Sequence, residues 1–106
     1  MKTDKILSLL GLAQKAGKLV SGEFMTENAI KDGSARIVIV AEDASDNTKK
    51  KFSNSAAYYE IPIAIYGDKE SVGHAIGKEF RASLAVTDDG FANAISRELR
   101  NRKEEA

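Results

Sequence analysis

The sequence contains no cysteine and only one histidine, His74, among its 106 residues. Disulfide bonds, thiolate chemistry and cysteine-ligated zinc are therefore excluded, and so is a histidine-rich metal site. The absence of cysteine is typical of a reducing compartment, and we expect a cytoplasmic protein without a metal or other cofactor. No obvious nucleophile or paired acid accompanies His74, so a surface or partly buried structural histidine is the simplest interpretation.

Long hydrophobic runs are also missing, since no stretch approaches the 18 residues that a membrane span needs. The first residues, MKTDKILSLLGLA, resemble a short signal peptide, but no small-residue cleavage site follows at 14–16. Ile6, Leu9, Leu10 and Ala13 fall on one helical face, as in an ordinary amphipathic helix. We therefore expect a helix of the folded domain here and no membrane partner.

The chain has no excess of either charge, because 16 basic residues balance 16 acidic residues. A protein of this kind that binds RNA must use a local basic patch and not a global field. Hydrophobic residues make up 42% of the sequence, which argues against disorder. The length suffices for one domain with a real core, covering residues 1–106, and not for two.

Helical and strand patterns alternate along the chain. The expected helices cover 4–16, 23–32, 47–59, 69–76 and a last one from 88 or 89, and the expected strands lie at 18–21, 35–41, 61–66 and 84–86. The run ARIVIVA at 35–41 is rich in β-branched residues, which indicates a strand covered on both faces. This order predicts an α/β domain, with a central sheet of about four strands between helices, but it leaves the strand order open.

Several single residues have local roles in this interpretation. Thr3 or Asp4 is expected to cap the first helix, and Asp88 or Asp89 the last one. Pro62 suits the entry of a strand. Gly73 inside a short helix costs about 1 kcal/mol relative to alanine, so it indicates either close packing or a tolerated weak helix. The basic residues of the last turns, Arg97, Arg100, Arg102 and Lys103, are most simply a solvated tail.

Three lysines, Lys49 to Lys51, stand in the first turns of the expected helix at 47–59. Ser45 or Asp46 can cap this helix. Cations at a helix N-terminus oppose the helix dipole by about 0.3–1 kcal/mol each at an exposed site. Free backbone N–H groups and lysines together form an anion site, for which phosphate is the natural ligand. A solvated basic turn that only aids solubility remains the alternative.

Two acid pairs follow expected strands, Glu42–Asp43 after 35–41 and Asp88–Asp89 after 84–86. Enzymes with α/β folds often place catalytic groups at strand ends, and two carboxylates can do acid–base chemistry or bind Mg²⁺. In principle the two pairs meet across the edge of the sheet. Helix capping explains Asp88 and Asp89 more simply, and no phosphate-binding glycine motif or metal-ligand spacing is present.

The segment GKEFRAS at 77–83 mixes Lys78 and Arg81 with Phe80 in a loop or strand approach. Cations beside an aromatic ring suit contact with a nucleic-acid backbone and stacking on a base. Phe80 is equally well explained as a core residue. The sequence alone leaves these two interpretations open.

Four segments together resemble a known family. They read LLGLAQKAGKLVSGE at 9–23, AIKDGSARIVIVAEDASDNTKKK at 29–51, YYEIPI at 58–63 and GHAIGKEFRASLAVTDDGFA at 73–92. The pattern is similar to the small kink-turn RNA-binding proteins typified by archaeal and eukaryotic ribosomal proteins, and most closely to their bacterial YlxQ-type relatives. The resemblance spans nearly the whole chain, and AEDASDNTKKK and IGKE…VTDDGFA are specific for the bacterial branch.

The resemblance implies a three-layer α/β/α sandwich with a central mixed sheet, no enzymatic activity, and a surface that binds structured RNA. The start of the second helix would enter the RNA groove, the loop at 78–83 would contact an extruded nucleotide, and basic residues would reach phosphates. The implied RNA-contacting positions are Gly22, Glu23, Phe24, Met25, Asn28, Ser45, Lys49, Lys50, Lys69, Lys78, Phe80, Arg81, Ala82 and Ser83.

Three of these positions depart from the family pattern. Phe24, Met25 and Asn28 stand where members that bind kink-turns tightly carry Asn, Glu and Lys. Asn and Glu hydrogen-bond guanine edges, which Phe and Met cannot do. Either Phe24 stacks on a base instead, or the second helix starts on a different face.

We therefore expect a monomeric, non-catalytic RNA-binding protein of the translation machinery, with structured and most simply ribosomal RNA as its partner. The ribosome or translation factors are further partners to consider. The first alternative is a protein-interaction module of the same fold that has lost kink-turn binding, which exposed Phe24 and Met25 would favour. The second is a small α/β enzyme or nucleotide binder that uses Glu42, Asp43 and Asp88.

Overall fold

Five helices and four strands alternate along residues 4–105, the part of the chain that this computed structural model describes, with side chains through residue 102. In order they are α1 (Lys5–Lys15), β1 (Leu19–Ser21), α2 (Glu23–Lys31), β2 (Ile37–Val40), α3 (Asp46–Tyr58), β3 (Ile63–Ile65), α4 (Lys69–Ala75), β4 (Ser83–Val86) and α5 (Asp89–Glu105). The elements expected from sequence are confirmed, and their ends differ by one or two residues at most.

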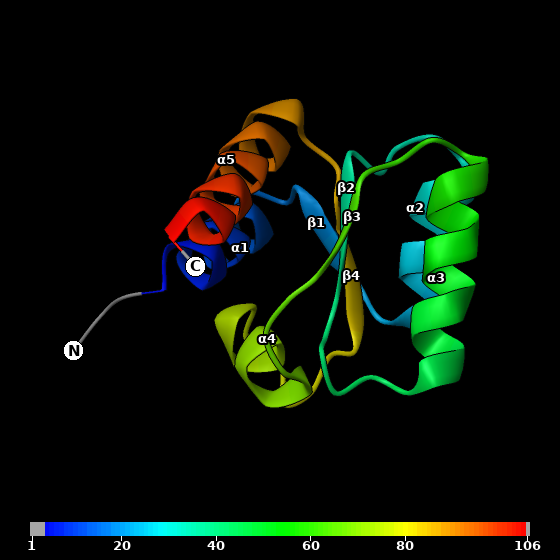
Figure 1. The fold of residues 1–106 in the computed structure, drawn as a ribbon, viewed down its shortest axis with the longest axis horizontal. Helices are drawn as coiled ribbons and strands as arrows, with labels where there is room; N and C mark the ends of the chain where they lie inside the picture. The colour runs from blue at the N-terminus through cyan, green and yellow to red at the C-terminus, as the bar shows by residue number, and fades with distance from the viewer. Residues whose placement is uncertain (1–3, 106) are drawn as a thin grey trace.

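The strands form a mixed sheet in the order β1-β4-β2-β3 (Figure 1). β2 and β3 run parallel, whereas β4 runs antiparallel to both of its neighbours, β1 and β2. β4 lies between β1 and β2 although it comes last in sequence. This order is what the sequence left open, and it decides which loops share an end of the sheet.

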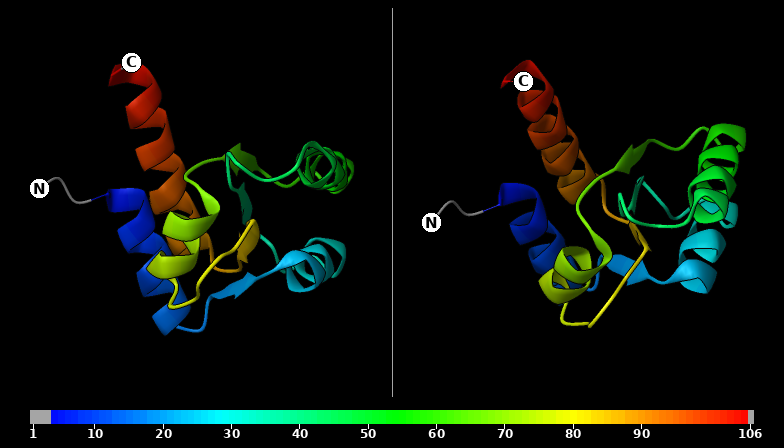
Figure 2. Two further views of the ribbon diagram at one scale, coloured as in Figure 1. Left: turned by 90° about the horizontal axis from the view of Figure 1, so that it is seen from below. Right: turned by 60° about the horizontal axis from the view of Figure 1, so that its bottom comes forward.

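Helices cover both faces of the sheet, which makes three layers (Figures 1 and 2). One core cluster joins α1, α4 and α5 to the sheet and includes Ile37 and Ile39, while the other joins α2 and α3 and includes Val38 and Val40. Alternate residues of β2 thus enter opposite cores, because successive side chains of a strand point to opposite faces. The expected strand covered on both faces is confirmed, and so is the three-layer sandwich.

Side-chain carboxylates and hydroxyls cap the N-termini of helices, as the sequence predicted. Asp4 Oδ1 accepts a 3.0 Å hydrogen bond from the Leu7 N–H and caps α1; the alternative cap, Thr3, lies outside the described residues. Asp88 Oδ2 accepts from the Phe91 N–H at 2.9 Å at the start of α5. Pro62 comes directly before β3, which suits its missing N–H.

Gly73 is buried where α4 packs against the segment that follows it. A Cβ at this position would lie 2.7 Å from the Glu79 carbonyl oxygen, and the Lys78 N–H donates a 2.8 Å hydrogen bond to the Gly73 carbonyl. Of the two interpretations of this glycine, close packing is therefore confirmed. The contact holds the chain after α4 against that helix.

The basic end of α5 is only partly a solvated tail. Arg102 Nη2 lies 3.3 Å from Asp4 Oδ1, and its guanidinium carbon lies 5.4 Å from the centre of the Tyr66 ring. Tyr66 in turn donates a hydrogen bond from its hydroxyl to Asp4 Oδ2. The side chain of Lys103 lies outside the described residues. Within residues 4–105, no helix is long and apolar enough to cross a bilayer.

Candidate nucleic-acid interface

Four connecting segments meet at one end of the sheet, the lower end in Figure 1. They are residues 21–24 after β1, 41–46 after β2, 67–69 after β3 and 77–82 before β4, and together we call them the rim. They meet because β1, β2 and β3 all end there and the antiparallel β4 begins there. Nearly all of the RNA-contacting positions expected from sequence lie on the rim or on the first turns of the helices that leave it.

Hydrogen bonds tie the 77–82 segment to the other parts of the rim. Arg81 Nε donates to Ser21 Oγ at 2.9 Å, and the Arg81 N–H donates to the Lys69 carbonyl at 3.0 Å. The Ala41 N–H donates to the Ala82 carbonyl at 2.9 Å. Segments separated by up to 60 residues in sequence are thus held in one arrangement.

The end of β2 is tied to the start of α4 in the same way. Asp43 Oδ1 accepts a 2.8 Å hydrogen bond from the Lys69 N–H, and the Glu42 N–H donates to the Gly67 carbonyl at 2.7 Å. Asp43 therefore satisfies a free donor at a helix N-terminus, as capping residues do. Its carboxylate has a structural partner, and Lys69 is positioned by it.

The two acid pairs do not meet, so that part of the enzyme hypothesis is wrong. Glu42–Asp43 follows β2 and Asp88–Asp89 follows β4, and the antiparallel pairing of these strands places the two at opposite ends of the sheet. Asp89 Oδ1 lies 3.1 Å from Arg36 Nε in an exposed ion pair. Among the described residues, no three metal-ligating side chains of His, Cys, Asp or Glu lie together.

Helix α2 begins at Gly22, whose φ of 93° is one that residues with a side chain rarely adopt. Gly22 offers no side-chain cap, so the first N–H groups of α2 have no acceptor from that residue. Phe24 and Met25 project outward, with 74% and 47% of their surfaces exposed, and Asn28 is exposed one turn later. The helix therefore does not start on a different face, and both apolar side chains are available to a partner.

The 77–82 segment presents Phe80 to solvent, with 57% of its surface exposed, beside the exposed Lys78. The interpretation of Phe80 as a core residue is therefore wrong. Phe80 and Lys69 line an open hollow of about 500 Å³, together with carboxylates that include Asp68. The hollow joins the aromatic ring to Lys69, whereas Lys78 and Arg81, the cations that the sequence placed beside Phe80, do not line it.

The loop expected at 78–83 ends one residue earlier than the resemblance implied. Ser83 pairs with Val40 as the first residue of β4 and is 1% exposed, so its side chain does not reach a ligand in this conformation. Its carbonyl accepts a 3.0 Å hydrogen bond from the Gly22 N–H. Ser83 thus positions the start of α2 through its backbone. Arg81 and Ala82 are half-buried.

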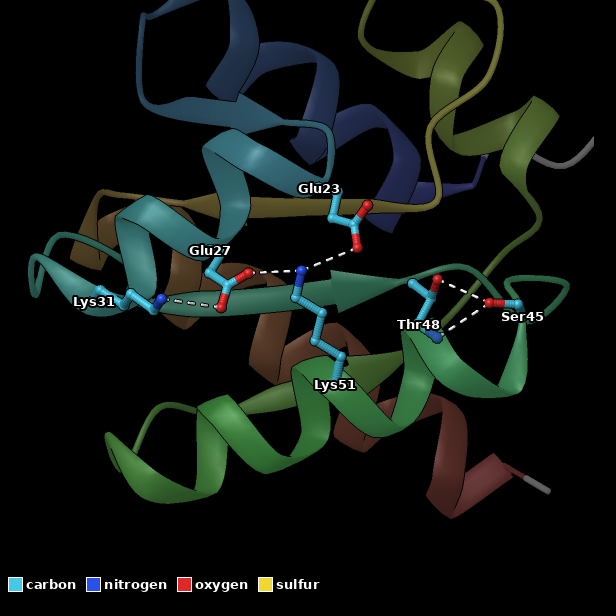
Figure 3. A network of polar contacts seen from close by, with 6 residues as sticks. All are labelled: Glu23, Glu27, Lys31, Ser45, Thr48 and Lys51. Carbon is cyan, nitrogen blue, oxygen red and sulfur yellow. Dashed lines mark hydrogen bonds and ion pairs between the residues drawn. The ribbon is translucent and has the colours of Figure 1, made fainter.

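One of the three lysines has acidic partners on the neighbouring helix. Figure 3 shows Lys51 Nζ between two carboxylates of α2, 3.0 Å from Glu23 Oε1 and 2.7 Å from Glu27 Oε2. Glu27 also lies 3.3 Å from Lys31. Hydrogen bonds from Lys51 and then Lys31 lower the pKa of Glu27, and those to Glu27 and Glu23 raise the pKa of Lys51. Lys51 therefore joins α3 to α2 and neutralises acid beside the rim.

The other two lysines take different directions because each helical residue turns about 100° from the last. Phe52 is buried, so Lys50, two residues before it, points away from the core and is exposed, whereas Lys49 is half-buried. Ser45 caps the helix, since its Oγ accepts a 3.1 Å hydrogen bond from the Thr48 N–H (Figure 3). The observed role of the Ser45 hydroxyl is thus to cap α3.

Sequence reasoning missed three residues that shape this surface: Ser21, Asp43 as the anchor of Lys69, and Lys51 as a bridge between helices. Each acts on residues between 24 and 60 positions away. No local pattern signals such a contact. Only the polar character of Ser21 and Asp43 beside strand ends is visible in the sequence.

Comparison with known proteins supports the fold and indicates the family to which the chain belongs. Residues 4–96 match the model of the "Ribosomal protein L7Ae/L30e/S12e/Gadd45 family". The "RNA-binding protein YlxQ" of Bacillus subtilis is 45% identical over 87 residues, which cover 82% of this chain and 87% of that protein. The "Large ribosomal subunit protein eL30" of Spodoptera frugiperda is 32% identical over 95 residues, covering 88% and 84%.

A solved structure shares this architecture closely. It is a protein of unknown function from Bacillus halodurans C, 38% identical, with a TM-score of 0.87 over 90% of this chain and 96% of that one. The sequence resemblance and the observed fold agree with the family model over nearly the same residues. The chain therefore belongs to the ribosomal protein L7Ae/L30e/S12e/Gadd45 family.

Proposed function

We propose that this protein is a non-catalytic RNA-binding protein of the translation machinery that docks structured RNA on the rim. The observation that carries the proposal is the meeting of Lys69, Lys78 and Arg81 with exposed Phe24 and Phe80 on one end of a neutral molecule. Cations reach phosphates, and exposed rings stack on unpaired bases. The RNA-binding name of the Bacillus subtilis relative supports the same conclusion.

The start of α2 is suited to the backbone or the bases of a bent RNA. Its uncapped N–H groups and positive dipole end attract phosphate. Phe24 and Met25 supply apolar surface where hydrogen-bonding side chains would read guanine edges. We infer that the protein recognises kink-turn-like or ribosomal RNA chiefly through its shape and splayed bases, with stacking on Phe24 in place of edge contacts.

Lys49 and Lys50 extend the basic surface from the rim along α3. We expect Lys49→Glu combined with Lys50→Glu to leave the fold intact and to weaken RNA binding strongly, because Lys50 is exposed and Lys49 is only half-buried, so neither side chain belongs to the core. The measurement is titration of a kink-turn RNA and of a straight duplex of equal length. Unchanged affinity at moderate salt would remove the lysines from the binding surface.

Salt dependence tests the phosphate contacts directly. Neutralising three to five phosphates gives a slope of log K against log salt of about −2 to −5, because bound counterions are released. A flat dependence for the unmodified chain would contradict RNA docking through cations. Equal binding of the bent RNA and the straight duplex would leave phosphate contact but contradict shape recognition.

A protein-interaction module of the same fold is the second candidate, and the exposure of Phe24 and Met25 favours it. Replacement of Phe24 by alanine separates the two. Loss of RNA affinity supports stacking. Unchanged RNA affinity, with RNA still bound through Phe80 and Arg81, would assign Phe24 to a protein partner instead. The enzyme alternative loses its carboxylate cluster because the acid pairs lie at opposite ends of the sheet.

A further inference from the structure

The outer edge of β3 has backbone groups that the sheet does not use. The Pro62 carbonyl and the Tyr66 N–H each form a 2.9 Å hydrogen bond with β2. Because successive peptide groups of a strand alternate in direction, those of Ile63 and Ile65 point away from β2. Within residues 4–105, β3 is an edge strand and no other strand pairs with this outer side. An added strand would find free donors and acceptors there.

A groove runs beside this edge and is lined by residues of both β3 and α5. Its volume is about 600 Å³, and apolar residues such as Ala64 and Leu99 line most of it. Ile65, at the end of β3, is 43% exposed although it is a large β-branched residue. An open strand edge next to an apolar groove is the arrangement that binds extended peptides by strand addition.

Charge indicates which kind of peptide fits. The charged side chains that line the groove, as far as the described residues go, are Arg100 and Arg102, both on α5. Arg102 is held in place by Asp4 and by the Tyr66 ring, and Arg100 is exposed. A carboxylate on a bound segment would meet these guanidinium groups, which form bidentate hydrogen bonds with carboxylates.

A second copy of this chain fits the groove poorly. Pairing of two β3 edges about a twofold axis brings the same surface of both copies together, and with it Arg100 and Arg102 of each. Like charges facing one another disfavour such a dimer. We propose that the β3 edge and its groove bind an extended segment of a partner protein, in which apolar residues alternate with Asp or Glu.

The groove shares no lining residue with the rim, whose segments are 21–24, 41–46, 67–69 and 77–82. RNA on the rim and a peptide on the β3 edge can therefore be bound together. The protein would then connect a structured RNA with an acidic protein segment. The peptide site does not depend on the RNA proposal, because its lining comes from β3 with its flanking residues, from the first residue of β2 and from α5, and not from the rim.

Selection from a displayed library of random twelve-residue peptides against the full chain tests the proposal. We expect enriched peptides to alternate apolar residues with Asp or Glu. Synthetic copies should bind Ile65→Lys and Arg100→Glu about tenfold more weakly, because one change blocks the edge and the other reverses the charge. Arg97→Glu, an exposed arginine of α5 outside the groove, is the matched control and should bind normally.

A second readout locates the peptide on the backbone. On binding, the amide protons of Ile63 and Ile65 should exchange more slowly, because they become hydrogen-bonded to the added strand. The absence of enriched acidic peptides would overturn the proposal, and so would binding that neither Ile65→Lys nor Arg100→Glu weakens. A dimer of the free chain in light scattering that Ile65→Lys abolishes would also overturn it, since the occupant would then be a second copy.

Discussion

Arg81 holds the 77–82 segment against the end of β1, shortly before α2, with its Nε donating a 2.9 Å hydrogen bond to Ser21 Oγ. Its Nη1 donates to the Phe80 carbonyl at 2.8 Å. One side chain thus orients the loop that carries Phe80 and connects it to the last residue of β1, which leads into the helix that carries Phe24. This contact is one of several hydrogen bonds that position the rim.

Replacement of Arg81 by lysine keeps the charge and removes the Nε donor. We expect RNA affinity to fall by about 1 kcal/mol or more, because the loop loses its bond to Ser21 and the ligand must then order it. Fluorescence titration measures the loss. Arg36→Lys, at the opposite end of the sheet, is the control and should leave affinity unchanged. Equal affinities for Arg81→Lys and the unmodified chain would show that the contact does not position the loop.

The Lys51–Glu27 contact is expected to contribute little to stability despite its 2.7 Å length. The Lys51 side chain is 38% exposed, and exposed pairs contribute about 0.2–1 kcal/mol. A double-mutant cycle with Lys51→Gln and Glu27→Gln, followed by urea unfolding, gives the coupling energy. The coupling should shrink at high salt. A coupling that is zero at low salt, or insensitive to salt, would contradict an electrostatic role.

Gly73→Ala is expected to destabilise the fold and to displace the 77–82 segment. The added Cβ would meet the Glu79 carbonyl at 2.7 Å, and such overpacking costs about 1–3 kcal/mol, more than the gain of about 1 kcal/mol in helix propensity. Gly90→Ala in α5 is the control, because its added Cβ would meet no backbone atom, only the side-chain Oδ2 of Asp88 at 3.1 Å, which need shift by only a few tenths of an ångström. If Gly73→Ala unfolds at the same urea concentration as Gly90→Ala, the packing argument fails.

Alkaline pH should weaken the contact between Tyr66, directly after β3, and Asp4 at the start of α1. Burial, and then the hydrogen bond to Asp4, raise the pKa of Tyr66 from 10.0 to about 12. A folded-state pKa above the unfolded value means that the contribution of Tyr66 is complete below about pH 10 and is lost as pH rises towards 12.

Tyr66→Phe tests this alkaline loss. The variant should be less stable at pH 8, and the difference from the unmodified chain should shrink between about pH 10 and 12. Urea unfolding across that range measures the difference. If the difference in free energy of unfolding stays constant with pH, the neutral Tyr66 hydroxyl does not stabilise the fold.

The family pattern and the local signals of this sequence predicted the helices, the strands, the helix caps and the candidate RNA-contacting positions. Periodic apolar residues marked the helices and strands, and small polar residues such as Ser45 and Asp88 marked helix starts, because capping is a matter of three or four neighbouring residues. The β-branched run around β2 indicated burial on both faces for an equally local reason. Family resemblance assigned the candidate positions, from Gly22 to Ala82, that the fold gathers near one end.

The tertiary structure alone decided three further matters. The antiparallel pairing of β4 with β2 separated the two acid pairs, and nothing in either pair's sequence reveals strand pairing or direction. Because β4 pairs with a strand on each side, Ser83 is buried as its first residue and does not belong to the expected loop at 78–83. Lys51 became a bridge to Glu23 and Glu27 because α2 packs beside α3. Such contacts depend on the sum of many weak packing preferences across the chain, and no short segment encodes them.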